Sequence, residues 1–129
     1  MRADLYQNCN IKFLEYQLNI LQRISNKPII FTFREEGKYG IKKDINVKKI
    51  LNMAIINGCS YIDLELGNDV LLNKKKSFII GSVHTSNLCI MRQNLLNIKR
   101  KKTDILKVVG KSYFYNHMEN LIDQFDLPK

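Results

Sequence analysis

The sequence predicts an α/β fold, because short segments rich in β-branched and aromatic residues alternate with segments whose apolar residues recur at helical spacing. Alternation of this kind produces right-handed crossovers between parallel strands. The chain has 129 residues, of which 45% are hydrophobic and 26% are charged, and these values are close to those of ordinary globular domains. We therefore expect one domain over residues 1–129 and no second domain.

The expected elements follow from this alternation. Helices are recognised by apolar residues three or four positions apart, and strands by runs of Ile, Val, Phe and Tyr. Asp44 is the expected N-cap of the second helix, and Gly58 is its expected C′ residue. In chain order we expect a helix over 10–25, a strand over 28–34, a loop over 35–40, a helix between 44 and 58, a strand over 60–66, a short helix over 69–73, a strand over 77–84, a helix around 88–98, a strand over 103–109 and a final helix around 114–125.

The chain is strongly basic, since 21 Lys and Arg residues face 12 Asp and Glu residues and leave a net charge of +9. Lysines gather in two runs, 74–76 and 99–102. This excess raises a basic nucleic-acid-binding module as an alternative function. Aromatic residues within the basic runs would favour that alternative, and none are there, so solvated surface is the simpler interpretation.

Location and redox state are indicated by what the sequence lacks. The N-terminal residues have no secretory-signal pattern, and no apolar run reaches the roughly 20 residues needed to span a bilayer. We therefore expect a cytoplasmic chain without membrane association. Cys9, Cys59 and Cys89 are far apart and form no C-x-x-C spacing, so we expect reduced, mostly buried thiols and no metal site.

Ionisable residues recur near the C-terminal ends of the predicted strands. Arg34, Glu65 and His84 lie at such ends, and Lys107 lies within the last predicted strand. In parallel α/β folds, ligands bind at this end of the sheet. We therefore expect the four side chains to converge on one site.

The residue types at this expected site permit Schiff-base chemistry. Apolar neighbours flank Lys107, and desolvation lowers the pKa of such an amine and makes it a nucleophile towards ketones. His84 titrates near neutrality and can move a proton on the carbon next to the iminium. The alternatives are a lysine that simply extends to solvent and a structural histidine.

Three further charged residues are candidates for supporting roles. Arg34 and Arg2 carry guanidinium groups that bind carboxylates through paired hydrogen bonds, so they are candidates for holding an acidic substrate. Glu65 is as well suited to positioning a basic neighbour as to catalysis. Pattern alone assigns no role to Glu36.

Five motifs carry a resemblance to a known family, because they stand in its order and at about its spacing. With them, the chain resembles type I 3-dehydroquinate dehydratase, and in particular the dehydratase region of the fungal pentafunctional arom polypeptide. The motifs are Arg2–Leu5, Ile30–Arg34, Tyr61–Leu66, Ser82–His84 and Asp104–Gly110.

The resemblance implies a (β/α)8 barrel that removes water from 3-dehydroquinate to give 3-dehydroshikimate, a step of the shikimate pathway of aromatic amino acid biosynthesis. It implies no cofactor, and the small-molecule substrate is the implied partner. By the same resemblance Lys107 matches the Schiff-base lysine and His84 the general acid/base. Arg34 and Arg2 match arginines that line the substrate site.

The chain departs from the family pattern in sequence and in extent. Thr85 stands where the family usually has Asp, and Glu36 matches the family's Glu-Gly-Gly only with a gap. By the family pattern, the chain covers about strands 3 to 6 of the barrel with their helices. We therefore expect an incomplete barrel with unpaired strand edges, completed by self-association or by other barrel polypeptide, and little activity of the chain alone. A structural segment of a multifunctional protein is a third alternative.

Overall fold

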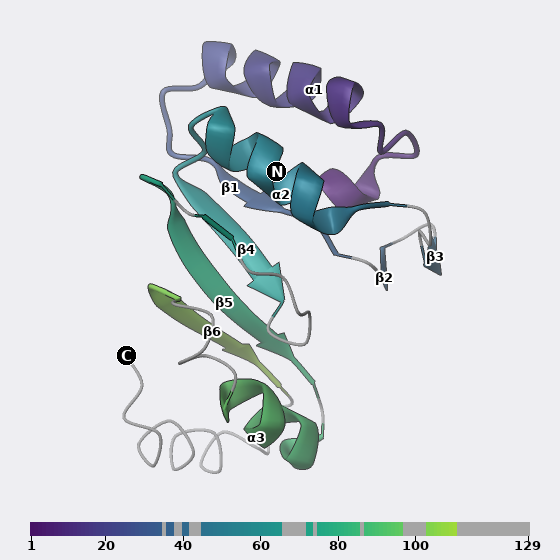
Figure 1. Ribbon diagram of the computed structural model, residues 1–129, viewed down its shortest axis with the longest axis vertical. Helices are drawn as coiled ribbons and strands as arrows, with labels where there is room; N and C mark the ends of the chain where they lie inside the picture. Colours follow the sequence, from purple (N-terminus) through teal and green to yellow (C-terminus); the bar gives the residue numbers. More distant parts are fainter. Residues whose placement is uncertain are drawn as a thin grey trace. The chain divides into compact units, whose positions relative to one another are not determined.

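The computed structural model describes residues 1–34, 36–37, 40–41, 45–65, 72–73, 75–85, 87–96 and 103–110. The chain divides into two compact units, of which the first is Met1–Asp63 with Val70–Phe78 and the second is Leu64–Asp69 with Ile79–Lys129. Each unit is described by itself. The elements, labelled in Figure 1, are η1 (Ala3–Leu5), α1 (Ile11–Ile24), β1 (Ile30–Thr32), β2 (Glu36–Gly37), β3 (Gly40–Ile41), α2 (Val47–Ile56), β4 (Tyr61–Glu65), β5 (Phe78–His84), α3 (Leu88–Leu96) and β6 (Ile105–Val109).

In the first unit, β1 forms a parallel pair with the beginning of β4. The register joins Ile30 to Tyr61 and Thr32 to Asp63. Arg2 makes an isolated parallel bridge to Thr32, whose backbone N–H donates to the Met1 carbonyl at 2.8 Å. The N-terminal residues therefore lie alongside β1 in the same direction, and the parallel pairing expected from the sequence is confirmed.

Two helices accompany this strand pair. α1 is capped by Asn10, whose side chain accepts the Lys12 backbone N–H at 2.9 Å, and it buries Leu14 and Leu18 completely. α2 contacts both α1 and β1, and Figure 1 shows the two helices running alongside each other. The apolar stripe predicted for residues 10–25 therefore faces protein, as expected for an amphipathic helix.

The ends of α2 confirm one expected cap and correct the other. The N-cap is Asn46, whose side chain accepts the Lys49 backbone N–H at 3.0 Å, and it is not Asp44, because the helix begins only at Val47. Gly58 is the C′ residue with φ of 76°, a conformation that glycine adopts without steric cost. Backbone bonds from Gly58 to Ile55 and from Cys59 to Ala54 complete a Schellman motif.

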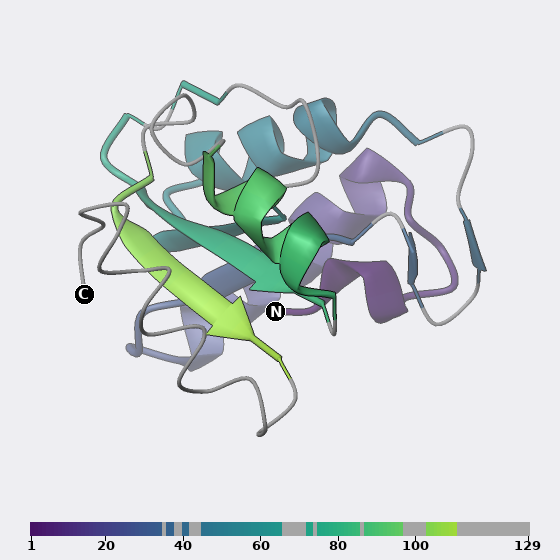
Figure 2. The same ribbon diagram turned by 90° about the horizontal axis from the view of Figure 1, so that it is seen from below.

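In the second unit, β5 and β6 form a parallel pair, which Figure 2 shows side by side. Asp104 joins their beginnings: its backbone N–H donates to the Ile79 carbonyl at 2.9 Å, and its carboxylate accepts the Ile79 N–H at 2.8 Å. All β5 residues from Ile79 to Val83 are buried, so burial on both faces is confirmed for this strand. β6 is less covered, since Ile105 and Val109 are each more than 40% exposed.

Other expectations differ from the structure or fall outside it. β2 and β3 form a short antiparallel pair within the stretch expected to be a loop, with Gly37 opposite Gly40. Of the three thiols only Cys59 is buried, while Cys89 is exposed, so the expectation of mostly buried cysteines is wrong. The final helix around 114–125 and most of the short helix over 69–73 lie outside the described residues. Within the described part of the chain, no helix has the length and apolar character needed to cross a membrane.

Candidate active site

Lys107 and His84 lie on the same face of the β5–β6 pair. The register places Lys107 opposite Ser82 and His84 opposite Val109. Paired residues in a sheet share a face, and residues two apart in a strand also share a face. Lys107, Ser82 and His84 therefore lie together on one side of the second unit, as expected for the strand-end site.

Glu65 is the ionisable partner of His84 within the same unit. Its Oε1 lies 3.4 Å from His84 Nδ1, and the two side chains are 31% and 20% exposed. Glu65 ends β4 and His84 ends β5, so the C-terminal ends of the two strands supply the pair. A carboxylate at this distance can orient the imidazole ring and stabilise positive charge on it.

Lys107 occupies the middle of β6, where the residues from Leu106 to Val108 are half-buried. Ser82 opposite Lys107 is only 1% exposed. Lys107 thus lies beside a buried residue of β5, on a strand that is itself only half-buried.

In the first unit, a buried carboxylate holds Arg2. Arg2 Nε donates to Asp4 Oδ1 at 2.9 Å and Nη2 to Oδ2 at 2.6 Å, in the paired geometry typical of guanidinium and carboxylate. Burial acts to raise the pKa of Asp4, but the hydrogen bond and charge of Arg2 outweigh it, and the pKa lies below its ordinary value.

The carboxylate of Asp4 also links Arg2 to Arg34. Arg34 follows β1, and its backbone N–H bonds to Asp4, which contributes to the lowered pKa of that carboxyl. The carboxylate is therefore bound by the guanidinium of Arg2 and by the backbone of Arg34. Sequence reasoning missed Asp4 as a positioning residue; the available signal was an acidic residue two positions from Arg2 in a segment without other acids.

The structure thus assembles the expected residues as two groups, one in each unit. Arg2 and Arg34 belong to the first unit, whereas Glu65, His84 and Lys107 belong to the second. Convergence of all of them on one site stays a prediction. Glu36 is the first residue of β2, and its side chain lies outside the described part.

Thr85, at the position where the family usually has Asp, starts the connection from β5 to α3. Its backbone N–H donates to the Val109 carbonyl at 3.1 Å, and its Oγ1 accepts the Asn87 N–H at 3.0 Å. Asn87 in turn accepts the Cys89 N–H at 2.9 Å and so caps α3. The hydroxyl at this position therefore helps to shape the turn after His84.

No cluster of three His, Cys, Asp or Glu side chains suited to a metal ion occurs among the residues the structure describes. The groups present are an amine, an imidazole and a carboxylate. Enzymes use this set to form Schiff bases with carbonyl compounds and to move protons on the adjacent carbon. Fold and side chains together thus define a parallel α/β protein that carries an amine, an imidazole and a carboxylate on neighbouring strands.

Comparison with protein families agrees with this class. Residues 1–120 match the family model described as type I 3-dehydroquinase, and the chain belongs to this family. The resemblance found in the sequence motifs is therefore confirmed.

Related proteins and a solved structure extend the comparison. The chain is 30% identical over 125 residues to the pentafunctional AROM polypeptide of Komagataella phaffii, an alignment that covers 85% of this chain and 8% of the relative. It is 35% identical over 91 residues to the AROM polypeptide of Scheffersomyces stipitis, covering 64% of this chain and 6% of the relative. The chain therefore spans less than a tenth of the length of these relatives.

The fold is similar to a solved structure described as the dehydroquinate dehydratase and shikimate dehydrogenase from S. pombe AroM. The TM-score is 0.73 at 23% identity, and the match covers 98% of this chain and 28% of the other. This similarity confirms the α/β fold class and is consistent with a partial barrel.

Proposed function

We propose that the chain supplies the central part of a 3-dehydroquinate dehydratase site, a lyase that converts 3-dehydroquinate to 3-dehydroshikimate and water. The observation that carries the proposal is the placement of Lys107 and His84 on one face, with Glu65 at 3.4 Å from the imidazole. Membership in the type I 3-dehydroquinase family supports the same reaction. The place in the shikimate pathway follows from that reaction.

The chemistry begins at Lys107. Its unprotonated amine attacks the ketone carbon, and uptake of one proton with loss of one water molecule leaves an iminium ion between Nζ and that carbon. The positive nitrogen withdraws electrons and acidifies the adjacent C–H. His84 accepts that proton, and the resulting enamine expels the hydroxyl on the next carbon as water, protonated by the same imidazole. Hydrolysis of the iminium consumes one water and restores Lys107, so the net reaction releases one water molecule.

The remaining residues act on position and charge. Glu65 holds the His84 ring and stabilises the imidazolium that forms when the proton is taken. Arg2 and Arg34 are suited to the substrate carboxylate, because guanidinium groups bind carboxylates through paired hydrogen bonds. Asp4 fixes the guanidinium of Arg2 and also bonds the backbone of Arg34. Barrel polypeptide beyond these residues or a second copy is the proposed partner, and the cytoplasmic location remains a prediction.

Borohydride trapping tests the role of Lys107. In a barrel completed with the remaining strands, incubation with 3-dehydroquinate and sodium borohydride is expected to attach reduced ligand covalently to Lys107, because borohydride reduces an iminium to a stable amine. Lys107→Ala is expected to abolish the adduct, as measured by mass spectrometry of the intact chain and its peptides. The control is Lys48→Ala, which removes an exposed lysine of α2. An adduct of undiminished yield in Lys107→Ala would assign the Schiff base to another lysine.

A further inference from the structure

The first unit contains a cavity of about 660 Å³ at the beginning of β4, the end opposite Glu65. The segment Lys75–Phe78, which leads into β5, forms one wall, and the end of α2 forms another. Its volume falls within the range of about 300 to 1,000 Å³ that small-molecule sites occupy. The proposed reaction uses none of the residues that line it.

The walls of this cavity are held by hydrogen bonds and by ring stacking. Phe78 donates its backbone N–H to the Ser60 carbonyl at 2.9 Å, and Ser77 Oγ donates to the Cys59 carbonyl at 2.7 Å. The rings of Tyr61 and Phe78 are stacked with centroids 5.7 Å apart. The cavity is therefore built before any ligand enters, which lowers the entropic cost of binding.

Some of the apolar side chains that line this cavity are exposed to solvent. Phe78 is 52% exposed and Ile56 is 69% exposed, and both line the cavity. Exposed aromatic and aliphatic side chains around a concave surface are typical of ligand sites. The stacked rings offer a flat face that suits a planar ring.

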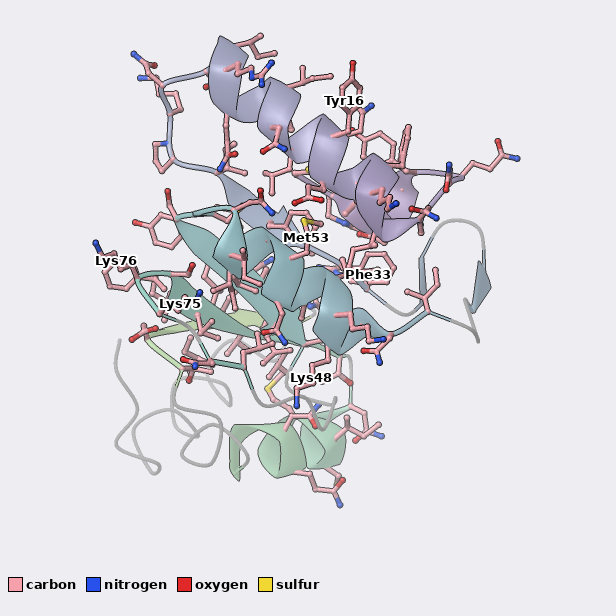
Figure 3. All side chains as sticks on the ribbon, turned by 45° about the horizontal axis from the view of Figure 1, so that its top comes forward. Tyr16, Phe33, Lys48, Met53, Lys75 and Lys76 are labelled. Atoms are coloured by element: carbon pink, nitrogen blue, oxygen red, sulfur yellow. The ribbon has the colours of Figure 1, made fainter. Side chains whose placement is uncertain are left out.

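Two lysines set the charge of the cavity. Lys75 and Lys76, labelled in Figure 3, lie next to each other in the turn before β5, and both are exposed. No Asp or Glu occurs among the described residues that line the cavity. Burial raises the pKa of the Cys59 thiol to about 11, so this lining residue is neutral at physiological pH. The cavity thus combines apolar walls with positive charge alone.

We propose that this cavity binds a small aromatic carboxylate, with its ring against Tyr61 and Phe78 and its carboxylate beside Lys75 and Lys76. A concave space of this volume favours a small molecule over an extended polypeptide surface. The excess of 21 basic over 12 acidic residues disfavours a second copy of the chain as the occupant of a positive site. The proposal is independent of the dehydratase reaction.

A first experiment measures the charge requirement with 2-naphthoate and its neutral counterpart 2-naphthylmethanol. Titration of the 129-residue chain by calorimetry is expected to show binding of the carboxylate at least about tenfold tighter than the alcohol, because only the carboxylate pairs with the ammonium groups. The double variant Lys75→Glu, Lys76→Glu is expected to lose this preference. The control is Lys48→Glu, Lys49→Glu, which makes the same charge change at adjacent exposed lysines of α2. Neither lysine is among the residues that line the cavity, and Lys48 is labelled in Figure 3.

A second experiment measures the ring requirement. Phe78→Ala is expected to weaken binding of both naphthyl compounds by about tenfold, the usual scale for losing one stacked and well-packed aromatic contact. Tyr16→Ala is the matched control, because Tyr16 is an aromatic residue of α1 that is 62% exposed and projects away from the fold (Figure 3). Circular dichroism of each variant checks that the fold is retained.

Several results would overturn the proposal. One is failure of 2-naphthoate to bind the native chain at millimolar concentration, and another is equal loss of affinity in the Lys48, Lys49 control, which would mean attraction by net charge alone. Concentration-dependent dimerisation in sedimentation experiments that Phe78→Ala abolishes would assign the cavity to a second copy. Preferential binding of an acidic peptide, such as one of six glutamates and one phenylalanine, would assign the cavity to a polypeptide.

Discussion

At the scale of single residues, the candidate site contains one ionisable pair, Glu65 and His84. Glu65 Oε1 lies 3.4 Å from His84 Nδ1, so the carboxylate is placed to hold the ring while the other nitrogen handles the substrate proton. Lys107 reaches the same face from the neighbouring strand. The proposed amine attack and the proposed proton transfer belong to different side chains, and each side chain can be removed separately.

Removing the imidazole is expected to stop turnover while leaving Schiff-base formation intact. In the completed barrel, His84→Ala should lower kcat by roughly 10² to 10⁴, the usual contribution of a general acid/base. The borohydride-reducible adduct on Lys107 should still accumulate, because attack by the amine precedes the step that needs His84. Steady-state kinetics and mass spectrometry measure the two effects. Near-normal turnover in His84→Ala would refute the acid/base role.

A second prediction at this scale concerns the Arg2–Asp4 pair and the pH dependence of the free energy of unfolding. Asp4 is fully buried, and Asp4→Asn is expected to lower the free energy of unfolding at pH 7 by about 1 to 3 kcal/mol, because a charged hydrogen-bonded partner of Arg2 is lost. The carboxyl has a lower pKa in the folded chain than its ordinary value of 3.8. Its stabilisation is therefore complete above that value and disappears as the pH falls through the folded pKa.

Urea unfolding of the native chain and of Asp4→Asn at a series of pH values measures this effect. The difference between the two proteins should be constant near neutrality and should shrink below about pH 4. A difference that stays constant down to pH 2 would mean that the charge of Asp4 does not contribute to stability.

At the scale of elements, Asp104 connects the beginnings of β5 and β6 through two bonds to Ile79. These bonds lie directly before the first pair of the β5–β6 register, the same register that places Lys107 opposite Ser82. A shift of one residue in that register would move Lys107 to the other face, since strand side chains alternate. Asp104 is thus the residue that aligns the candidate nucleophile with its face of the sheet.

This arrangement predicts different effects for two substitutions of Asp104. Asp104→Ala removes the acceptor for the Ile79 N–H at 2.8 Å and is expected to lower the free energy of unfolding by about 1 to 3 kcal/mol. Asp104→Asn keeps an acceptor oxygen in the same place and should cost less than half as much. Thermal and urea unfolding measure both variants. Equal losses would show that the charge, and not the hydrogen bond, holds the two strands.

At the scale of the whole molecule, the strands of this chain leave much apolar surface accessible. Ile30, Ile105 and Val109 are each more than 40% exposed, although they lie in strands. Surface of this kind favours association with further polypeptide. It also lets water reach the strand that carries Lys107, whereas an efficient Schiff-base site excludes water.

We therefore expect the 129-residue chain by itself to show little or no dehydratase activity. The measurement is a steady-state assay of the conjugated product, run at several protein concentrations to detect activity that arises by self-association. Turnover of about 1 s⁻¹ or faster would be within the range of ordinary enzymes and would contradict the expectation. Activity that rises more than linearly with concentration would identify a second copy as the completing partner.

The sequence by itself determined those features that depend on local pattern. The parallel α/β class, the C′ role of Gly58 and the buried core of β5 were all predictable, because apolar periodicity and glycine conformation are properties of short segments. The five motifs, in their order and spacing, were sufficient to indicate the family. Their catalytic roles stay predictions until the variants above are measured.

Only the tertiary structure decided which distant residues meet. The contact of Glu65 with His84 and the bonds that join Asp104 to Ile79 depend on where separate segments pack. The N-cap of α2 at Asn46 instead of Asp44 has the same origin, because tertiary packing chooses among neighbouring polar residues that are equally able to cap. The sequence determines which chemical groups the chain carries, and the tertiary packing determines which of these groups are in contact.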